Sequence, residues 1–308
     1  MSCAWITHAD CRRHEMGEGH PECPERLDAI SDHLTATRLM PYLAPCEAPL
    51  ATPEQLGRAH TALYVHEIHD AAPRQGYVHV DPDTAMNAHT LAAALRAAGA
   101  AVMGAEMVVS GEFRRAFCAV RPPGHHAMRD RAMGFCFFNN VAVGIRHALD
   151  VLGLERVALV DFDVHHGNGS EDILANDDRV LMVSTFQRDL YPFLGDVPLG
   201  ANMVNIALPA GADGEALRRA VEGSWLPALE RFRPQLIFIS AGFDAHRADD
   251  MAGLRFVESD YAWVTRELIG VAERHCEGRI VSCLEGGYHL FALARSVAAH
   301  VSELAGAA

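Results

Sequence analysis

Short apolar runs alternate along this chain with longer stretches in which apolar positions recur at helical spacing. The apolar runs predict strands at residues 4–7, 116–120, 156–161, 180–185, 203–206, 236–241 and 280–284. The intervening stretches predict helices at residues 24–37, 88–110, 141–151, 214–231, 261–276 and 291–305. Several runs are apolar throughout, which is typical of strands covered on both faces of a parallel sheet. We therefore expect residues 1–308 to form a single α/β domain with a doubly wound, mainly parallel sheet flanked by helices.

Polar side chains gather at or just past the ends of five of these predicted strands. The segments are Arg121-Pro-Pro-Gly-His125-His126, Asp161-Phe-Asp163-Val-His165, Ser184-Thr185, Asp244 and Glu285-Gly-Gly-Tyr288. Ligands of open α/β sheets bind in the crevice outside the carboxyl ends of the strands. This recurrence favours a catalytic site over a set of unrelated turn residues.

Asp163, His165 and Asp244 have the spacing of a metal site. Side chains two positions apart in an extended chain project to the same side, so Asp163 and His165 can bind one ion together. Asp244, which follows another strand, supplies a third ligand and leaves a position open, as in catalytic zinc sites. Mixed nitrogen and oxygen ligands suit Zn²⁺, although Fe²⁺, Co²⁺ and Mn²⁺ also fit. Too few bridging carboxylates are present for two metals, so we expect one zinc ion per chain.

The adjacent pair His125-His126 follows a Pro-Pro-Gly turn that fixes the backbone and directs both imidazoles into one cleft. A neutral histidine near a metal-bound water can take its proton and return it to an amine leaving group. Asp161 is interpreted as a carboxylate that orients an imidazole. The Tyr288 hydroxyl can donate to an oxyanion, with a buried core tyrosine as the alternative. Two further histidines are interpreted as structural, namely His166 and His246.

Composition and charge narrow the classes of function. Half of the 308 residues are hydrophobic, as in a soluble enzyme with a substantial core. The net charge of −14, without any basic run, argues against a nucleic-acid binder. The eight cysteines include no CxxC pair, which favours free thiols in a reducing compartment. Because we find no signal peptide and no long uninterrupted apolar stretch, we expect a cytoplasmic protein without a membrane partner; its oligomeric state stays open.

Taken in order, these segments resemble the histone deacetylase superfamily. The matching motifs are Arg121-Pro-Pro-Gly-His-His126, Gly134-Phe-Cys-Phe-Phe-Asn-Asn140, Asp161-Phe-Asp-Val-His-His-Gly-Asn-Gly169, Ala241-Gly-Phe-Asp244 and Glu285-Gly-Gly-Tyr288. The segment from Gly19 to Arg26 also fits. The chain is similar in particular to bacterial, class II-like histone deacetylase-like amidohydrolases. The resemblance implies an arginase-like α/β fold and hydrolysis of an acetylated lysine side chain or an acetylated small amine.

The resemblance also implies a role for each site residue. The zinc ligands would be the three residues already singled out by their spacing. His126 would be the main general base and acid, and His125, oriented by Asp161, would act mainly through its charge. Tyr288 would bind the oxyanion. Asn168 stands where class I enzymes carry an aspartate, and should leave His126 less strongly biased towards its charged form.

Family enzymes also carry structural potassium. The residues that match one such site, largely through main-chain oxygens, are Asp161, Asp163, His165, Ser184 and Thr185. We therefore expect K⁺ in addition to Zn²⁺.

The resemblance further implies a narrow channel for the substrate. Phe135, with Gly134 before it, and Phe193 would line the channel, while Asp83 would lie at its rim. Met251 occupies the position where enzymes specialised for acetylpolyamines place an acidic residue, so it favours acyl-lysine. An acetylpolyamine or other small-molecule amidohydrolase is the alternative enzyme, and a non-catalytic acyl-ligand binding protein is the alternative of a different class.

Overall fold

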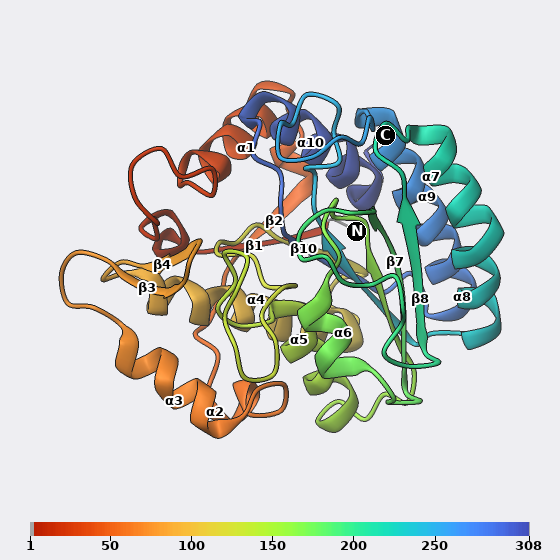
Figure 1. Cartoon of the computed structure of the whole chain (residues 1–308). Helices are drawn as coiled ribbons and strands as arrows, with labels where there is room; N and C mark the ends of the chain where they lie inside the picture. The colour runs from red at the N-terminus through yellow and green to blue at the C-terminus, as the bar shows by residue number, and fades with distance from the viewer. Residues whose placement is uncertain (1–2, 308) are drawn as a thin grey trace.

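The computed structural model describes residues 3–307, and a parallel sheet of eight strands forms its centre (Figure 1). The strands are β1 (Cys3–Thr7), β2 (Leu43–Glu47), β5 (Arg115–Cys118), β6 (Val157–Asp161), β7 (Val180–Gln187), β8 (Met203–Leu208), β9 (Leu236–Ala241) and β10 (Ile280–Leu284). They lie in the order β2-β1-β5-β10-β9-β6-β7-β8, and every neighbouring pair is parallel. The predicted α/β fold with a parallel sheet is confirmed.

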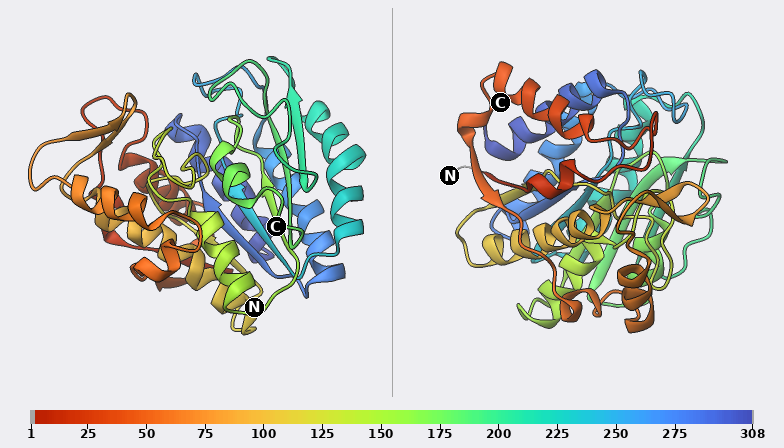
Figure 2. Two further views of the ribbon diagram at one scale, coloured as in Figure 1. Left: turned by 60° about the horizontal axis from the view of Figure 1, so that its bottom comes forward. Right: turned by 90° about the vertical axis from the view of Figure 1, so that its left-hand side faces the viewer.

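Helices cover both faces of this sheet, as Figure 2 shows from two sides. One layer contains α4 (Thr90–Val109), α5 (Asn140–Asp150) and α6 (Asn168–Leu174). The other contains α1 (Glu25–Ala36), α7 (Gly214–Ala220), α8 (Leu226–Phe232), α9 (Glu258–His275) and α10 (Leu290–Ala305). By length and composition α4 is apolar enough to cross a membrane, yet 67% of its most apolar window is buried inside the protein, as in a core helix.

Smaller elements complete the described part of the chain. They are the 3₁₀ turns Ala9–Arg12 and Met40–Tyr42, the helices α2 (Pro53–Leu56) and α3 (Ala62–Ala71), and the antiparallel hairpin β3 (Val78–Asp81) with β4 (Thr84–Met86). The sequence analysis missed the two helices, the hairpin, α6 and strand β2. β2 is an edge strand that contains Pro45, and only Leu43 of its five residues is buried, so it lacks the continuous apolar run of the central strands.

The helix predicted over residues 214–231 is interrupted in the structure. A π-helical turn, Val221–Trp225, separates α7 from α8. Pro227 follows this turn and has no N–H with which to continue the regular α-helical hydrogen bonds. The apolar periodicity therefore predicted the segment but not its change of geometry.

The middle of the sheet positions the polar strand ends. Every residue of β6, β9 and β10 is buried, because helices cover both faces of these strands. In the pairing of β6 with β9, Asp161 lies opposite Ser240, so the two loops that follow leave the sheet side by side. Side chains from sequence-distant loops are thereby brought together at the carboxyl edge of a rigid core.

Candidate active site

Asp163, His165 and Asp244 converge at the carboxyl ends of β6 and β9. The Nδ1 atom of His165 lies 3.2 Å from Asp163 Oδ1 and 3.2 Å from Asp244 Oδ2. All three side chains are buried, and their candidate ligand atoms lie within 4.8 Å of one another. The structure thus brings together the three residues whose spacing predicted a metal site.

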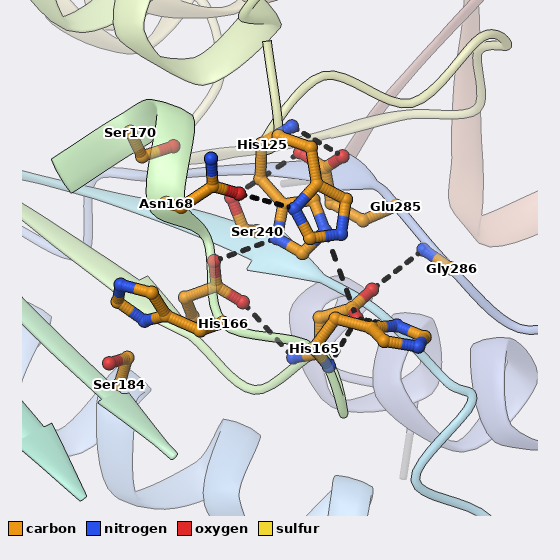
Figure 3. Close-up of polar contacts among 12 residues, drawn as sticks. His125, His165, His166, Asn168, Ser170, Ser184, Ser240, Glu285 and Gly286 are labelled. Atoms are coloured by element: carbon orange, nitrogen blue, oxygen red, sulfur yellow. Dashed lines mark hydrogen bonds and ion pairs between the residues drawn. The ribbon is translucent and has the colours of Figure 1, made fainter. Parts of the chain in front are cut away.

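The surroundings of these side chains fit a divalent cation. The backbone N–H of Gly286 donates to Asp163 Oδ2 at 2.9 Å, and that of Val164 donates to Asp244 Oδ1 at 2.9 Å (Figure 3 draws the Gly286 contact). Asp244 Oδ2 is buried and accepts no hydrogen bond from the part of the chain that the structure describes. A Cβ at position 286 would lie 2.1 Å from this oxygen, so only glycine allows the backbone so close. Backbone hydrogen bonds thus fix both carboxylates, and Asp244 Oδ2 remains free to bind a metal ion beside the His165 imidazole.

Electrostatics favour positive charge at this point. Burial and the neighbouring Asp163 carboxylate raise the pKa of Asp244 to about 6. Burial alone would lower the pKa of His165, but its contacts with the two carboxylates raise that pKa to about 10. Both shifts report the same buried excess of negative charge, which a bound cation would neutralise.

Two hydrogen-bonded histidines lie beside this centre. His125 Nδ1 is 3.0 Å from Asp161 Oδ2, and His126 Nδ1 is 2.7 Å from Asn168 Oδ1 (Figure 3). The centroids of the two imidazole rings are 4.1 Å apart. Because an amide oxygen only accepts, Nδ1 of His126 carries the hydrogen and its Nε2 is free to take a proton.

The two histidines have opposite electrostatic environments. Burial disfavours the charged form of His125, but the carboxylates of Asp163 and Asp161 raise its pKa well above the usual value. Burial and the nearby His125 lower the pKa of His126 well below its usual value. The backbone N–H groups of Gly124 and His125 both donate to the buried Glu285 carboxylate, which fixes this turn. The surroundings therefore favour the charged form of His125 and the neutral form of His126.

A cavity of about 230 Å³ opens onto these residues. Its lining residues are Asp83, His126, Gly134, Phe135, His165, Leu190, Tyr191, Met251 and Tyr288. Gly134, Phe135, Asp83 and Met251, which the resemblance assigned to the substrate channel and its rim, are all among these lining residues. Tyr288 is there as well, with its ring edge-on to Phe135 at a centroid distance of 5.9 Å.

The structure corrects the expectation for Phe193. This side chain is 75% exposed and does not line the cavity; Tyr191, two positions earlier, does. The backbone turns here, because the Phe193 N–H donates to the Leu190 carbonyl at 2.7 Å and Phe193 adopts the left-handed conformation. The Tyr191 ring instead lies edge-on to His126, at a centroid distance of 5.2 Å. Tyr191 follows β7 at the carboxyl edge of the sheet, and this position after a strand could have identified it as a cavity residue from the sequence.

Two buried charged residues that the sequence analysis did not select hold the Tyr288 segment. The Arg26 guanidinium lies 5.0 Å from the centroid of the Tyr288 ring and donates to the Gly287 carbonyl at 2.7 Å. Asp249 Oδ2 accepts from the backbone N–H of Tyr288 at 2.7 Å and of His289 at 3.0 Å. Neither residue follows a strand directly, so the strand-end criterion did not find them.

The remaining candidates lie around this centre. Ser184 pairs with Asp161 across β6 and β7, and both Ser184 and Thr185 are buried. His166 Nε2 is 2.7 Å from a Glu171 carboxylate oxygen. His246 Nε2 lies 3.5 Å from a carboxylate oxygen of Glu258.

Comparisons with known proteins agree with this arrangement. The family model described as histone deacetylase domain matches residues 20–304. A probable deacetylase of Archaeoglobus fulgidus is 37% identical over 294 residues, covering 92% of this chain and 80% of that protein. A histone deacetylase-like amidohydrolase of Pseudomonas aeruginosa is 38% identical over 277 residues, covering 88% and 73%. The solved HDA15 HD domain superposes with a TM-score of 0.92 at 31% identity, covering 99% of this chain and 90% of that one. This chain belongs to the histone deacetylase family.

Proposed function

We propose that this protein is a zinc-dependent deacetylase that hydrolyses the acetyl amide of lysine-type amines and releases acetate. The observation that carries the proposal is the lining of the cavity. His126, His165 and Tyr288 line it together, and His165 belongs to the buried group of candidate metal ligands with Asp163 and Asp244. A base, an oxyanion donor and a metal site at one cavity are the parts that amide hydrolysis requires.

The side chains divide the chemistry between them. Zinc held by Asp163, His165 and Asp244 would polarise the amide carbonyl and acidify water. His126, kept neutral by its lowered pKa, takes the water proton on Nε2 and later returns it to the departing amine. Burial raises the pKa of Tyr288, so its hydroxyl stays protonated and donates to the oxyanion.

Two further assignments belong to the proposal. Main-chain oxygens around Asp161, Asp163, His165, Ser184 and Thr185 are proposed to hold a structural potassium ion, supported by the burial of this segment of β6 and β7. The enzyme is proposed to act in the cytoplasm.

An acetylpolyamine amidohydrolase would use the same chemistry, so substrates must separate the two. Met251 places an apolar side chain in the cavity lining, which offers no charge to a second ammonium group. We therefore expect zinc-loaded protein to have a kcat/KM at least about tenfold higher for an acetyl-lysine peptide than for N-acetylputrescine, a difference of about 1.4 kcal/mol. The opposite preference would establish the polyamine reaction. Absence of acetate release from either substrate would favour a binding protein.

Asp249 gives a prediction about positioning. Asp249→Ala removes the acceptor for two backbone N–H groups beside the oxyanion donor, so the Tyr288 hydroxyl should lose its fixed position. Hydrogen bonds to a charged group contribute about 1.5–3 kcal/mol, so we expect kcat to fall about 10–100-fold with little change in KM. Asp249→Asn keeps an acceptor oxygen and should retain more activity.

The control for this prediction is Asp250→Ala, because Asp250 is the exposed neighbour. In a Tyr288→Phe background, Asp249→Ala should lower kcat by a much smaller factor than it does in the wild type, because the hydroxyl that Asp249 positions is already absent. If Asp249→Ala lowers kcat by the same factor in both backgrounds, Asp249 acts only through the general stability of the protein.

A further inference from the structure

Glu22 carries a buried carboxylate that the proposed chemistry does not use. Its Oε1 atom accepts from Arg26 Nη1 at 3.1 Å and from Arg121 Nε, and its Oε2 atom accepts from Arg121 Nη2 at 2.6 Å. His14 Nε2 lies 3.2 Å from the same Oε2 atom. Burial alone would raise the pKa of Glu22, but the Arg121 guanidinium lowers that pKa below its usual value. Glu22 is therefore a charged group held between two buried cations.

Arg121 is the fixed side of this cluster. It donates to both oxygens of Glu22 from Nε and Nη2, and its Nη1 atom donates to the carbonyls of Cys11 at 2.9 Å and His14 at 3.1 Å. The planar fork of a guanidinium matches the two oxygens of a carboxylate. Because Arg121 is itself held by two backbone carbonyls, it determines where the Glu22 carboxylate lies.

Arg26 is the side of the cluster that reaches the catalytic segment. Its Nε atom donates to the Gly287 carbonyl at 2.7 Å and its Nη2 atom to the Glu285 carbonyl at 2.5 Å. Both carbonyls belong to the segment that leads into Tyr288, whose ring centroid lies 5.0 Å from the guanidinium. The third nitrogen, Nη1, donates to Glu22. Since the guanidinium is planar and rigid, the position of the Glu22 carboxylate fixes the direction in which Arg26 holds the two carbonyls.

We infer that Glu22 is a positioning residue, whose carboxylate orients Arg26 and, through Arg26, the segment that carries the Tyr288 hydroxyl. This inference rests on the proposed function and adds a residue to the part of the site that binds the oxyanion. Glu22 is not among the residues that line the cavity, so it acts without touching the substrate. Its loss should therefore change the rate of the chemical step more than the binding of the substrate.

The alternative is that this ion cluster only stabilises the fold. Removing one partner of a buried ion pair destabilises a protein strongly, because the other charge stays buried without its partner. A purely structural role thus predicts lower thermal stability and no particular link to Tyr288. A positioning role predicts a lower kcat whose size depends on the presence of the Tyr288 hydroxyl, and this difference decides between the two.

The test is Glu22→Gln in zinc-loaded protein, measured with a fluorogenic acetyl-lysine peptide. Glutamine keeps the size of the side chain but has one acceptor oxygen and one NH₂ group, so either the two-point contact with Arg121 or the contact with Arg26 is lost. A small displacement of a reacting group can lower a rate by about 10², so we expect kcat to fall about 10–100-fold with KM within about twofold of wild type. In a Tyr288→Phe background, the same substitution should change kcat by less than about twofold.

Glu25→Gln is the matched control, because Glu25 is exposed and lies only three residues further along the chain. This variant should keep the wild-type kcat. If Glu22→Gln does not fold, Glu22→Asp replaces it, because aspartate keeps the charge between the two guanidiniums. Its side chain is one CH₂ group shorter, so the fork of Arg121 should hold it out of reach of Arg26, and we expect a similar fall in kcat. Elemental analysis should find one zinc ion per chain in every variant.

Three results would overturn the inference and leave the proposed deacetylase intact. One is a folded Glu22 variant with the wild-type kcat. Another is a fall in kcat by the same factor with and without the Tyr288 hydroxyl, which would assign Glu22 to general stability. The third is a loss of zinc from the Glu22 variant, which would mean that Glu22 acts on the metal site. Failure of the proposed function itself would appear in the wild type, as no acetate release from any acylated amine, and would overturn the inference as well, because no oxyanion donor would remain to be positioned.

Discussion

Replacing Tyr288 with phenylalanine is expected to lower kcat by about 10²–10³ while the protein stays folded, because one oxyanion donor is commonly worth that much. The substitution removes only the hydroxyl. The ring keeps its contact with the Arg26 guanidinium at 5.0 Å and with the Phe135 ring at 5.9 Å. The measurement is single-substrate kinetics on a fluorogenic acetyl-lysine peptide, together with thermal unfolding of both proteins.

A matched tyrosine is available as a control for this substitution. Tyr42 is 51% exposed and lies outside the cavity lining, so Tyr42→Phe should have wild-type kcat and wild-type thermal stability. If Tyr288→Phe turns over the peptide at nearly the wild-type rate, the hydroxyl does not bind the oxyanion. If Tyr288→Phe loses thermal stability together with kcat, the hydroxyl contributes to the packing of the folded protein and its effect on kcat is indirect.

The sequence predicted the centre of the fold better than its edges. β6, β9 and β10 are buried on both faces, so a continuous apolar run identifies each of them. β2 pairs on one side only and tolerates Pro45, so its pattern resembles that of a loop. α6 begins at Asn168 inside a glycine-containing site motif, and its first residues are polar although they are buried. Periodicity detects elements whose burial follows a repeat, and these two do not follow one.

The candidate site was predictable where the chain itself fixes the geometry. Asp163 and His165 are two residues apart in a segment that leaves a strand, so their convergence follows from local structure. The choice between Tyr191 and Phe193 for the cavity wall depended on a turn closed by one backbone hydrogen bond, which composition does not reveal. Arg26 reaches the Gly287 carbonyl across 261 positions of sequence, and only the folded chain shows such a contact.

Substituting Asp244 with asparagine is expected to remove the metal and nearly all activity. Its Oδ2 atom is buried and accepts no hydrogen bond from the described residues, and in asparagine one of the two carboxylate oxygens becomes an amide nitrogen that cannot bind a cation. Metal contributes several kcal/mol to the transition state of such reactions, so kcat/KM should fall by about 10³ or more. Elemental analysis after dialysis against zinc should find one ion per wild-type chain and less than about a tenth of that in the variant, since a ligand that cannot bind leaves an incomplete site.

A buried aspartate elsewhere controls for the loss of a charge. Asp260 is 4% exposed and accepts from Arg218 at 3.0 Å, away from the cavity, so Asp260→Asn should keep one zinc ion per chain. Chelation followed by added zinc should restore wild-type activity and leave Asp244→Asn inactive, because in that variant the site itself is changed. A variant that is inactive yet still holds one zinc ion per chain would place the ligand elsewhere. Because metal content is measured apart from turnover, that result would reject the ligand assignment and leave the roles of His126 and Tyr288 to their own tests.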